Sequence, residues 1–224
     1  MAIGKDMKGV VLASGSPRRR ELLGLLGLPF EVVVPRVKED AAKDEDVRKT
    51  AMGLARMKAE EAAHVRQGEV IVASDTLVVL GDQVVGKPEN AAEALAMLQA
   101  LRGRKHQVTS GIVVHDPPGR SPAVHAVETQ VWMRDYSDRE IADYIARDEP
   151  FDKAGGYAIQ DRDFRPVDRI EGCYSNVMGL PLCHLYVLLE KVGVTPPVSP
   201  HKACEMHTEQ RCLVAVDILD GANR

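Results

Sequence analysis

Three consecutive arginines, Arg18, Arg19 and Arg20, occupy the first turn of a predicted helix, directly after Ser14 and Ser16. The first turn of a helix has unpaired N–H groups and a partial positive charge, so acidic residues are favoured there and arginines are not. The arrangement becomes favourable if an anion lies in the turn, held by backbone N–H groups, the serine hydroxyls and the guanidinium groups. It therefore predicts an anion site, with phosphate as the anion. The alternative is that the arginines are solvated and that their cost, about 0.3–1 kcal/mol each, is tolerated.

The second informative residue is Asp75, an acid that lies between the apolar residues 70–73 and 77–80. The flanking runs indicate a position at the edge or mouth of a sheet, and aspartate is rare in strands unless something there requires it. We predict that Asp75 binds a metal or acts as a general base. The alternative is that its carboxylate caps local backbone N–H groups.

Two isolated lysines lie where a cleft would need positive charge. Lys58 is on the apolar stripe of a helix predicted over 47–65, four residues after Leu54 and four before Ala62. Its side chain either extends along apolar surface to water or reaches an anionic ligand, and the helix pattern favours neither. Lys87 follows a predicted hairpin and is the second isolated cation near the end of a sheet.

A second glycine-bearing polar segment, residues 152–161, contains Lys153 and Gln160. Its Gly155-Gly156 pair is either an ordinary turn or a place where the backbone approaches a ligand closely. The segment by itself leaves both interpretations open.

Nine polar residues in unusual positions combine several cations with two acids. A polyphosphate bound with Mg²⁺ requires that mixture, because cations neutralise the phosphate oxygens while carboxylates hold the metal and orient water. A peptidase or glycosidase needs fewer cations, and no G-x-S-x-G sequence marks a serine hydrolase. The nine residues are Ser14, Arg18, Arg19, Glu39, Lys58, Asp75, Lys87, Lys153 and Gln160.

Alternating strand and helix patterns predict an α/β fold that positions these residues. Ser16 is predicted to cap the first helix, Pro17 to begin it and Gly27 to stop it. Further helices are expected over 47–65, from Asn90 to Gly103 and over 181–193. Another is expected over 137–147, with Ser137 and Glu140 as its capping box. Strands are expected over 10–13, 31–34, 70–73, 77–80, 83–85, 107–114, 124–133, 157–159 and 164–170, with a polar break at 74–76.

The totals exclude several classes of protein. The 224 residues, 45% of them hydrophobic, suffice for one large core or for two lobes around a cleft. A formal net charge of −4 argues against a general nucleic-acid binder. The apolar runs are too short to cross a membrane and the N-terminus lacks the apolar region of a secretory signal. We therefore expect a soluble cytoplasmic protein that binds neither nucleic acid nor membranes.

The C-terminal residues form a separate segment after a proline-rich linker over 195–200. We predict one domain over 1–193 and an extension of unknown role over 194–224. The four cysteines have no C-x-x-C spacing and are expected to be reduced thiols. In the extension, Cys204, His207 and Cys212, with His201 upstream, offer soft-metal ligands, but their spacing fits no standard zinc pattern.

Five blocks occur in the order of a known family: LASGSPRRRELL (12–23), ASDTLVVL (73–80), GKP (86–88), DKAGGYAIQ (152–160) and YSNVMGLPL (174–182). Together they resemble the Maf family of nucleoside triphosphate pyrophosphatases, also called septum-formation-inhibitor-like proteins. The resemblance extends over residues 9–192. It implies an inosine-triphosphatase-like fold, with an elongated, twisted mixed sheet flanked by helices and two lobes around a central cleft. It also points to a homodimer.

The resemblance implies hydrolysis of a nucleoside triphosphate between the α and β phosphates, with Mg²⁺ or Mn²⁺ as cofactor. By resemblance, Asp75 is the proton acceptor that activates water, and Glu39 is a metal-binding acid beside it. The other residues carried over bind the phosphates: Ser14, Arg19, Lys58 and Lys87.

Three residues, Arg18, Thr76 and Gln160, match the branch of the family that acts on dTTP and UTP. The branch that acts on 7-methyl-GTP carries Trp, Gln and Glu at these places. The amide of Gln160 can offer a donor and an acceptor to the O4 and N3–H edge of a pyrimidine. CTP and modified pyrimidine nucleotides are further candidate substrates.

The sequence departs from this branch at three places. Ser74 replaces a more usual Ala, Asp161 replaces a usual Gly, and residues 163–168 replace a glycine-rich stretch. An extra carboxylate beside the base pocket is expected to shift base preference. Two other functions stay open: a nucleotide-sensing module that binds without cutting, and a purine-directed triphosphatase that removes inosine or xanthosine triphosphate.

Overall fold

The computed structural model describes residues 9–37, 44–116 and 121–221. Its strands are β1 (Val10–Ala13), β2 (Phe30–Val33), β3 (Val70–Leu80), β4 (Gln83–Val85), β5 (Lys105–His115), β6 (Ala123–Met133) and β7 (Val167–Glu171). Its helices are α1 (Pro17–Gly24), α2 (Val47–Val65), α3 (Ala91–Leu101), α4 (Asp138–Ile145), α5 (Tyr174–Val177), α6 (Leu182–Lys191), α7 (Pro200–Thr208) and α8 (Ala215–Gly221), with a 3₁₀ turn, η2 (Ala154–Gly156).

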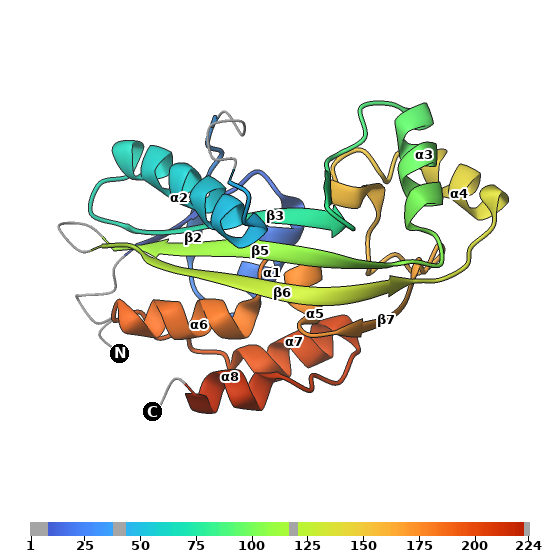
Figure 1. Cartoon of the computed structure of the whole chain (residues 1–224). Helices are drawn as coiled ribbons and strands as arrows, with labels where there is room; N and C mark the ends of the chain where they lie inside the picture. Colours follow the sequence, from blue (N-terminus) through green and yellow to red (C-terminus); the bar gives the residue numbers. More distant parts are fainter. Residues whose placement is uncertain (1–8, 38–43, 117–120, 222–224) are drawn as a thin grey trace.

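The strands form one mixed sheet in the order β2-β1-β3-β5-β6-β7, and β4 pairs with the end of β3. β1 is parallel to β2 and β3, whereas the other pairs are antiparallel. Helix α2 covers one face, and α1, α5 and α6 cover the other (Figure 1). The predicted α/β architecture, a long mixed sheet flanked by helices, is therefore confirmed.

Helix α2 lies unusually close to the sheet. The layer between them contains small side chains, including Ala55 and Ala59 from the helix and Ala73 from β3. Gly111 on β5 has no side chain under the helix, and a Cβ there would lie 2.3 Å from the carbonyl group of Ala51. This close packing fixes the height of α2 above the strands.

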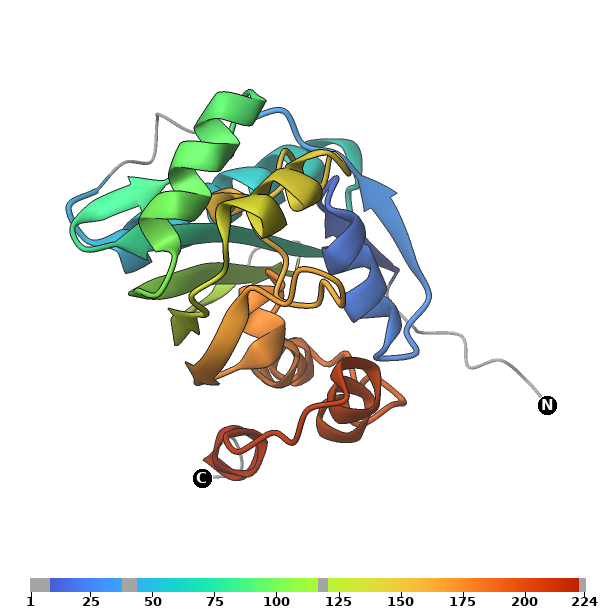
Figure 2. The same cartoon turned by 90° about the vertical axis from the view of Figure 1, so that its right-hand side faces the viewer.

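A second lobe forms at the far end of the sheet around α3 and α4 (Figure 2). Its core includes the aromatic side chains of Tyr136, Tyr144, Tyr157 and Phe164. Ser137 and Glu140 form the predicted capping box at the start of α4. The two predicted lobes are thus present, each with its own apolar cluster.

Among the described strands, none pairs with one edge of β3 over residues 74–77. On this edge β1 pairs with β3 as far as Ala73, and β4 pairs with it from Val78 onward. The opposite edge is continuously paired with β5 from Ile71 to Val79. Residues 74–77 of β3 therefore border a gap in the described sheet.

Two predictions of secondary structure are wrong. The polar break at 74–76 does not interrupt β3, because pairing with β5 keeps these residues extended. Residues 157–159 form no strand, because Gly155 and Gly156 adopt positive φ angles of 74° and 67° and turn the chain within η2. Short helix α5 was not predicted.

The C-terminal segment folds onto the body of the protein (Figures 1 and 2). Helices α7 and α8 pack against α6, and the Cys204 side chain joins the core there. Cys173 and Cys183 are also buried, Cys212 is half-buried, and none of the four forms a disulfide. No described helix is long and apolar enough to cross a membrane. The division into 1–193 and 194–224 stays a prediction.

Candidate active site

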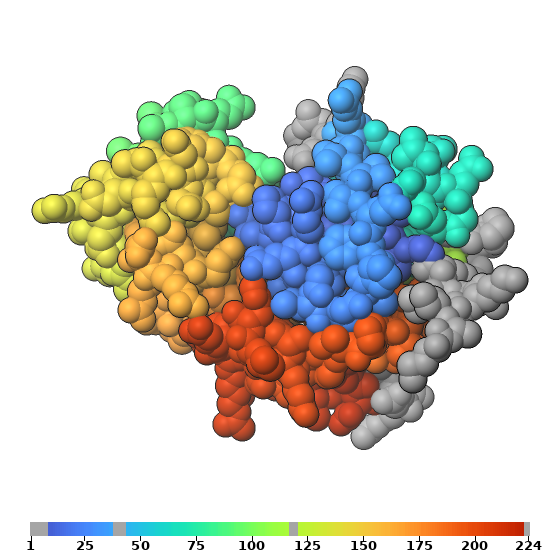
Figure 3. Space-filling model, turned by 180° about the vertical axis from the view of Figure 1, so that it is seen from behind, coloured from blue at the N-terminus to red at the C-terminus, as the bar shows by residue number. Residues whose placement is uncertain are grey.

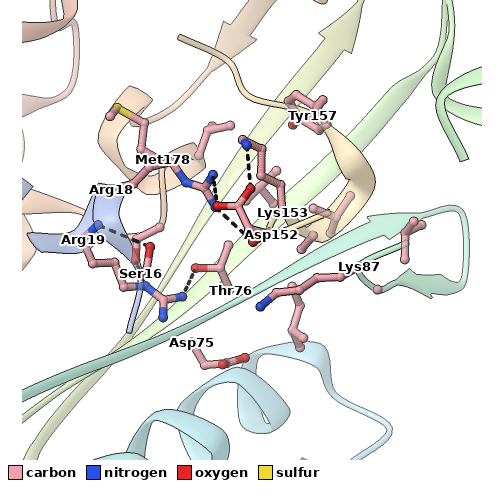
Figure 4. Close-up of a pocket in the computed structure, with 18 of the residues that line it drawn as sticks. Ser16, Arg18, Arg19, Asp75, Thr76, Lys87, Asp152, Lys153, Tyr157 and Met178 are labelled. Atoms are coloured by element: carbon pink, nitrogen blue, oxygen red, sulfur yellow. Dashed lines mark hydrogen bonds and ion pairs between the residues drawn. The ribbon is translucent and has the colours of Figure 1, made fainter. Parts of the chain in front are cut away.

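A cleft lies between the two lobes, above the gap at the edge of β3 (Figures 3 and 4). It consists of a hollow of about 540 Å³ and an adjoining one of about 380 Å³. Both hollows are lined by Ser16, Arg19, Lys58, Lys87 and Asp152. Residues from α1, α2, β3, the end of β4 and the η2 segment thus share one space.

Asp75 and Lys58 form an ion pair at the floor of the cleft. Asp75 is 6% exposed and the Lys58 side chain 13%. Gly111 lies opposite Asp75 on β5, so the helix that carries Lys58 can approach the strand that carries Asp75. The Lys58 ammonium therefore turns to Asp75 and does not extend away along apolar surface. Among the described residues, the Asp75 carboxylate accepts no backbone hydrogen bond.

Three hydrogen bonds fix the guanidinium group of Arg19. It donates to the carbonyl oxygen of Gly179 at 3.0 Å, to Oγ of Thr76 at 3.0 Å and to Oγ of Ser14 at 3.3 Å. Ser16 caps helix α1, whose first turn contains no acid. The arrangement leaves positive charge and a helix N-terminus at one wall of the cleft, as the anion site requires.

The three arginines of the first turn do not behave alike. Arg20 is exposed and lies outside the cleft lining, whereas Arg18 and Arg19 enter it. Arg18 crosses to the other lobe and forms an ion pair with Asp152 at 3.2 Å. Solvation alone therefore explains the environment of Arg20 but not that of Arg18 or Arg19.

Lys153 lines the cleft but its ammonium group turns back to neighbouring acceptors. It contacts the backbone carbonyl oxygen of Glu149, the carboxylate of Glu149 at 3.1 Å and that of Asp152 at 2.5 Å. Burial alone would raise the pKa of Asp152, but the hydrogen bond from Lys153 and the charge of Arg18 bring that pKa below its ordinary value. The carboxylate of Asp152 thus joins cations from both lobes.

Lys87 points into the cleft from the segment after β4 (Figure 4). Its ammonium group forms no ion pair or hydrogen bond within the part of the chain that the structure describes. It is positioned to compensate the charge of a bound anion.

The larger hollow extends to apolar side chains that do not line the smaller one, and we call this part the apolar end. Val78, Val108 and Met178 line it together with Gln160. The amide oxygen of Gln160 is buried and has no hydrogen-bond partner among the described residues. A buried acceptor without a partner is costly, so this end is prepared for a ligand that brings a donor.

Nine of the predicted site residues line the cleft, and the tenth, Glu39, lies outside the described residues. Ser74, one of the departures from the dTTP/UTP branch, donates to the carbonyl oxygen of Gly179 at 2.9 Å and does not belong to the lining of the cleft. The nine residues are Ser14, Arg18, Arg19, Lys58, Asp75, Thr76, Lys87, Lys153 and Gln160.

Several residues that support the site were not predicted. Thr76 shares a hydrogen bond of 2.9 Å with Ser110, whose hydroxyl donates to the backbone oxygen of Asn176 at 3.3 Å. Gly179 accepts the bonds from Arg19 and Ser74. Arg36 lines the smaller hollow. Gly179 lies in the block over 174–182 that carries the family resemblance, so its importance could have been predicted from the sequence. No local sequence feature distinguishes Ser110 or Arg36.

The chain is similar to known proteins over most of its length. Residues 9–192 match the model of a family described as "Maf-like protein". A "dTTP/UTP pyrophosphatase" of Thermomicrobium roseum is 45% identical over 213 residues, which cover 92% of this chain and 94% of the relative. The protein of the same description from Dictyoglomus thermophilum is 42% identical over 191 residues, with 83% and 97% covered.

Among solved structures, the chain is similar to the Ham1 protein of Staphylococcus aureus, with a TM-score of 0.42 and 17% identity over 57% of this chain and 73% of that one. A HAM1 protein from Coxiella burnetii matches with a TM-score of 0.41 and 19% identity, over 58% of this chain and 75% of that one.

Proposed function

The chain belongs to the Maf-like protein family, and from this premise we propose that it hydrolyses dTTP and UTP to the monophosphate and pyrophosphate. The observation that carries the proposal is the convergence of Arg19, Lys58 and Lys87 with Asp75 on one cleft. Several cations beside a buried carboxylate suit a triphosphate and an attacking water. The name shared by relatives from different organisms supports the choice of bases.

In this proposal the cleft has a phosphate end and a base end. Ser14, Arg19, Lys58 and Lys87 neutralise and hold the phosphate oxygens. The apolar end receives the pyrimidine, whose N3–H group donates to the amide oxygen of Gln160 while its O4 accepts from the amide nitrogen. CTP and modified pyrimidine nucleotides are weaker candidates, because their hydrogen-bonding edges or sizes differ.

We propose Mg²⁺ or Mn²⁺ as cofactor, with Asp75 as the ligand among the described residues and Glu39 as a second. No group of three or more potential metal ligands occurs among the described side chains. One buried carboxylate in a cation-rich cleft nevertheless fits Mg²⁺, which proteins commonly hold through one or two carboxylates plus substrate phosphates. When bound, such an ion neutralises phosphate oxygens and lowers the pKa of a bound water.

The reaction is an in-line displacement at the α-phosphorus. Asp75 accepts a proton from water as the water oxygen bonds to that phosphorus, and the bond from the α-phosphorus to the oxygen that bridges it to the β-phosphorus breaks. The electron pair leaves with pyrophosphate, whose charge Arg19, Lys58 and Lys87 neutralise. The three hydrogen bonds that fix Arg19 before substrate binds reduce the reorganisation that this step requires.

The first test is a pyrophosphate-release assay with Mg²⁺ and a panel of triphosphates. We expect turnover with UTP and dTTP that exceeds turnover with ITP and XTP. Reaction in ¹⁸O-labelled water should place the label in UMP and leave pyrophosphate unlabelled. Binding without release would support the sensor instead, and preference for ITP or XTP would support the purine-directed hydrolase. A cytoplasmic location and a homodimer remain predictions.

Gly179→Ala should weaken UTP binding by displacing Arg19. Gly179 has a φ of 106°, and a Cβ there would lie 3.2 Å from Nε of Arg19 and 3.3 Å from Oγ of Thr76. We expect KM for UTP to rise about tenfold, equivalent to about 1.4 kcal/mol. Steady-state kinetics measure the change in KM. Thermal unfolding measures any loss of stability that the strained backbone causes.

The matched control is Gly193→Ala. Gly193 also has a positive φ, 81°, but a Cβ there meets nothing within 4 Å. It shares the backbone strain of roughly 1–2 kcal/mol without touching Arg19. A similar KM for both variants would mean that Gly179 does not act through Arg19.

A further inference from the structure

The loop that follows Gln160 is held by an aspartate whose carboxylate faces away from the cleft. Asp161 lines the neighbouring hollow beside the C-terminal helices and is absent from the lining of the nucleotide cleft. Its carboxylate does not add charge to the base end directly. The expected effect of this extra acid on base preference therefore has to be indirect, through the position of a neighbouring residue.

One carboxylate oxygen of Asp161 organises the loop. It accepts hydrogen bonds from the backbone N–H of Phe164 at 2.6 Å, from that of Asp163 at 3.1 Å and from the Arg147 guanidinium at 3.0 Å. The backbone oxygen of Asp161 accepts from Arg165 N at 3.1 Å. With its side chain only 8% exposed, Asp161 is the centre of a compact turn.

Arg147 attaches this turn to the second lobe. It follows α4, forms a second ion pair with Asp163 at 3.1 Å and lies over the ring of Tyr144 at 5.3 Å. Phe164, the next residue of the turn, stacks on Tyr144 with ring centroids 4.5 Å apart. Burial alone would raise the pKa of Asp161, but the hydrogen bond from Arg147 brings it below its ordinary value, so the pair is charged at neutral pH.

Within the described part of the chain, in contrast, no hydrogen bond holds the side-chain amide of Gln160. Its amide oxygen is buried and unpartnered among the described residues. The place of this amide is therefore determined by the backbone on either side of it. The peptide that follows Gln160 is held because Asp161 N donates to the backbone oxygen of Ala158 at 3.2 Å.

We propose that Arg147 and Asp161 are positioning residues for base selectivity, which hold the Gln160 amide at the base end of the cleft through the turn over 161–165. The inference rests on the proposed function and concerns the base, not the phosphates. A uracil presents a donor at N3 and cytosine an acceptor, so an amide in a fixed place and orientation distinguishes them. A loosened turn lets the amide shift or rotate, and the distinction weakens.

The test compares Arg147→Met, Asp161→Ala and the double variant with the parent. We expect KM for UTP to rise about tenfold while kcat stays within about twofold, because affinity depends on a preorganised site. The ratio of kcat/KM for UTP over CTP should fall about fivefold, and the double variant should resemble the single ones because the two residues act as a unit. Inhibition by pyrophosphate should not change, because pyrophosphate needs only the phosphate end.

Two further variants separate positioning from general stability. Arg139→Met is the control on α4: Arg139 forms a 3.9 Å ion pair with Asp143 and its side chain is 92% exposed. It should behave as the parent. Arg147→Lys keeps the positive charge, so its UTP affinity should be closer to that of the parent than to that of Arg147→Met. This variant keeps the inference testable if Arg147→Met or Asp161→Ala folds poorly.

Three results would overturn the inference. The first is that both single variants keep the parent values of KM for UTP and of the UTP/CTP ratio. The second is a parallel loss of affinity for UTP and for pyrophosphate, which indicates that the whole cleft is less ordered. A parent protein that releases no pyrophosphate from any pyrimidine triphosphate would overturn the proposed function and this inference with it. An active parent with unchanged variants would overturn the inference alone.

Discussion

Asp75→Asn should lower kcat for UTP by at least about 100-fold, the usual range for loss of a general base. The Asn side chain has nearly the same size, and its amide oxygen can still accept the hydrogen bond from Lys58. The fold and the cation-rich walls of the cleft are therefore retained. The amide cannot accept the proton of the attacking water, so at saturating Mg²⁺ the loss should appear in kcat. Measurement at saturating Mg²⁺ is needed because Asp75 is also the proposed metal ligand.

Pyrophosphate release gives kcat, and calorimetric titration with UTP gives the affinity of the variant. Asp82→Asn is the matched control, since Asp82 is an exposed acid in the turn between β3 and β4. It should keep parent activity. Turnover of UTP by Asp75→Asn at the parent rate would show that Asp75 serves only as the partner of Lys58.

Arg19→Met should lower kcat/KM for UTP by roughly 100- to 1000-fold, as removal of one preorganised donor to a developing charge typically does. The guanidinium is already held by Gly179, Thr76 and Ser14 before substrate binds. Methionine keeps the apolar stem and removes the charge and all the donors. Part of the loss should therefore remain at saturating UTP.

Arg20→Met tests whether position in the cleft, and not the number of arginines in α1, is what matters. Arg20 has the same side chain on the same helix turn but is exposed outside the cleft. Its kcat/KM should stay within about twofold of the parent, as for a substitution of a solvated side chain. Equal losses in the two variants would contradict the assigned role of Arg19.

Local sequence physics predicted the residues that are out of place for their own element. Arginines at a helix N-terminus, a lysine on an apolar stripe and an acid between two apolar runs each conflict with local preference. Arg19, Lys58 and Asp75 illustrate the three cases, and the structure brings them to one cleft. The capping signals at Ser16 and Ser137 likewise predicted where α1 and α4 begin.

What the sequence could not predict depends on contacts between distant segments. The pairing of β3 with β5 keeps Ser74 to Thr76 extended, although these residues alone indicate a break. Ser110 and Asn176 support Thr76 only because strand pairing and helix α5 bring them together. The strand order and the gap over 74–77 follow from the topology of the whole sheet, which local periodicity does not contain.

Asp161 shows the same limit at the base end. The sequence marks it only as an extra acid beside Gln160, which suggests a direct electrostatic effect on the base. The structure turns its carboxylate toward Arg147 and the neighbouring backbone instead. The direction of a side chain after a turn depends on the partner that the fold supplies, and Arg147 is fourteen residues away along the chain.

The most direct test of the central claim is a crystal structure of Asp75→Asn with UTP and Mg²⁺. The account predicts the triphosphate between Arg19, Lys58 and Lys87, the uracil at the amide of Gln160, and the α-phosphorus as the phosphorus nearest to residue 75. A nucleotide bound outside this cleft, or one whose base lies at the cation-rich end, would contradict it.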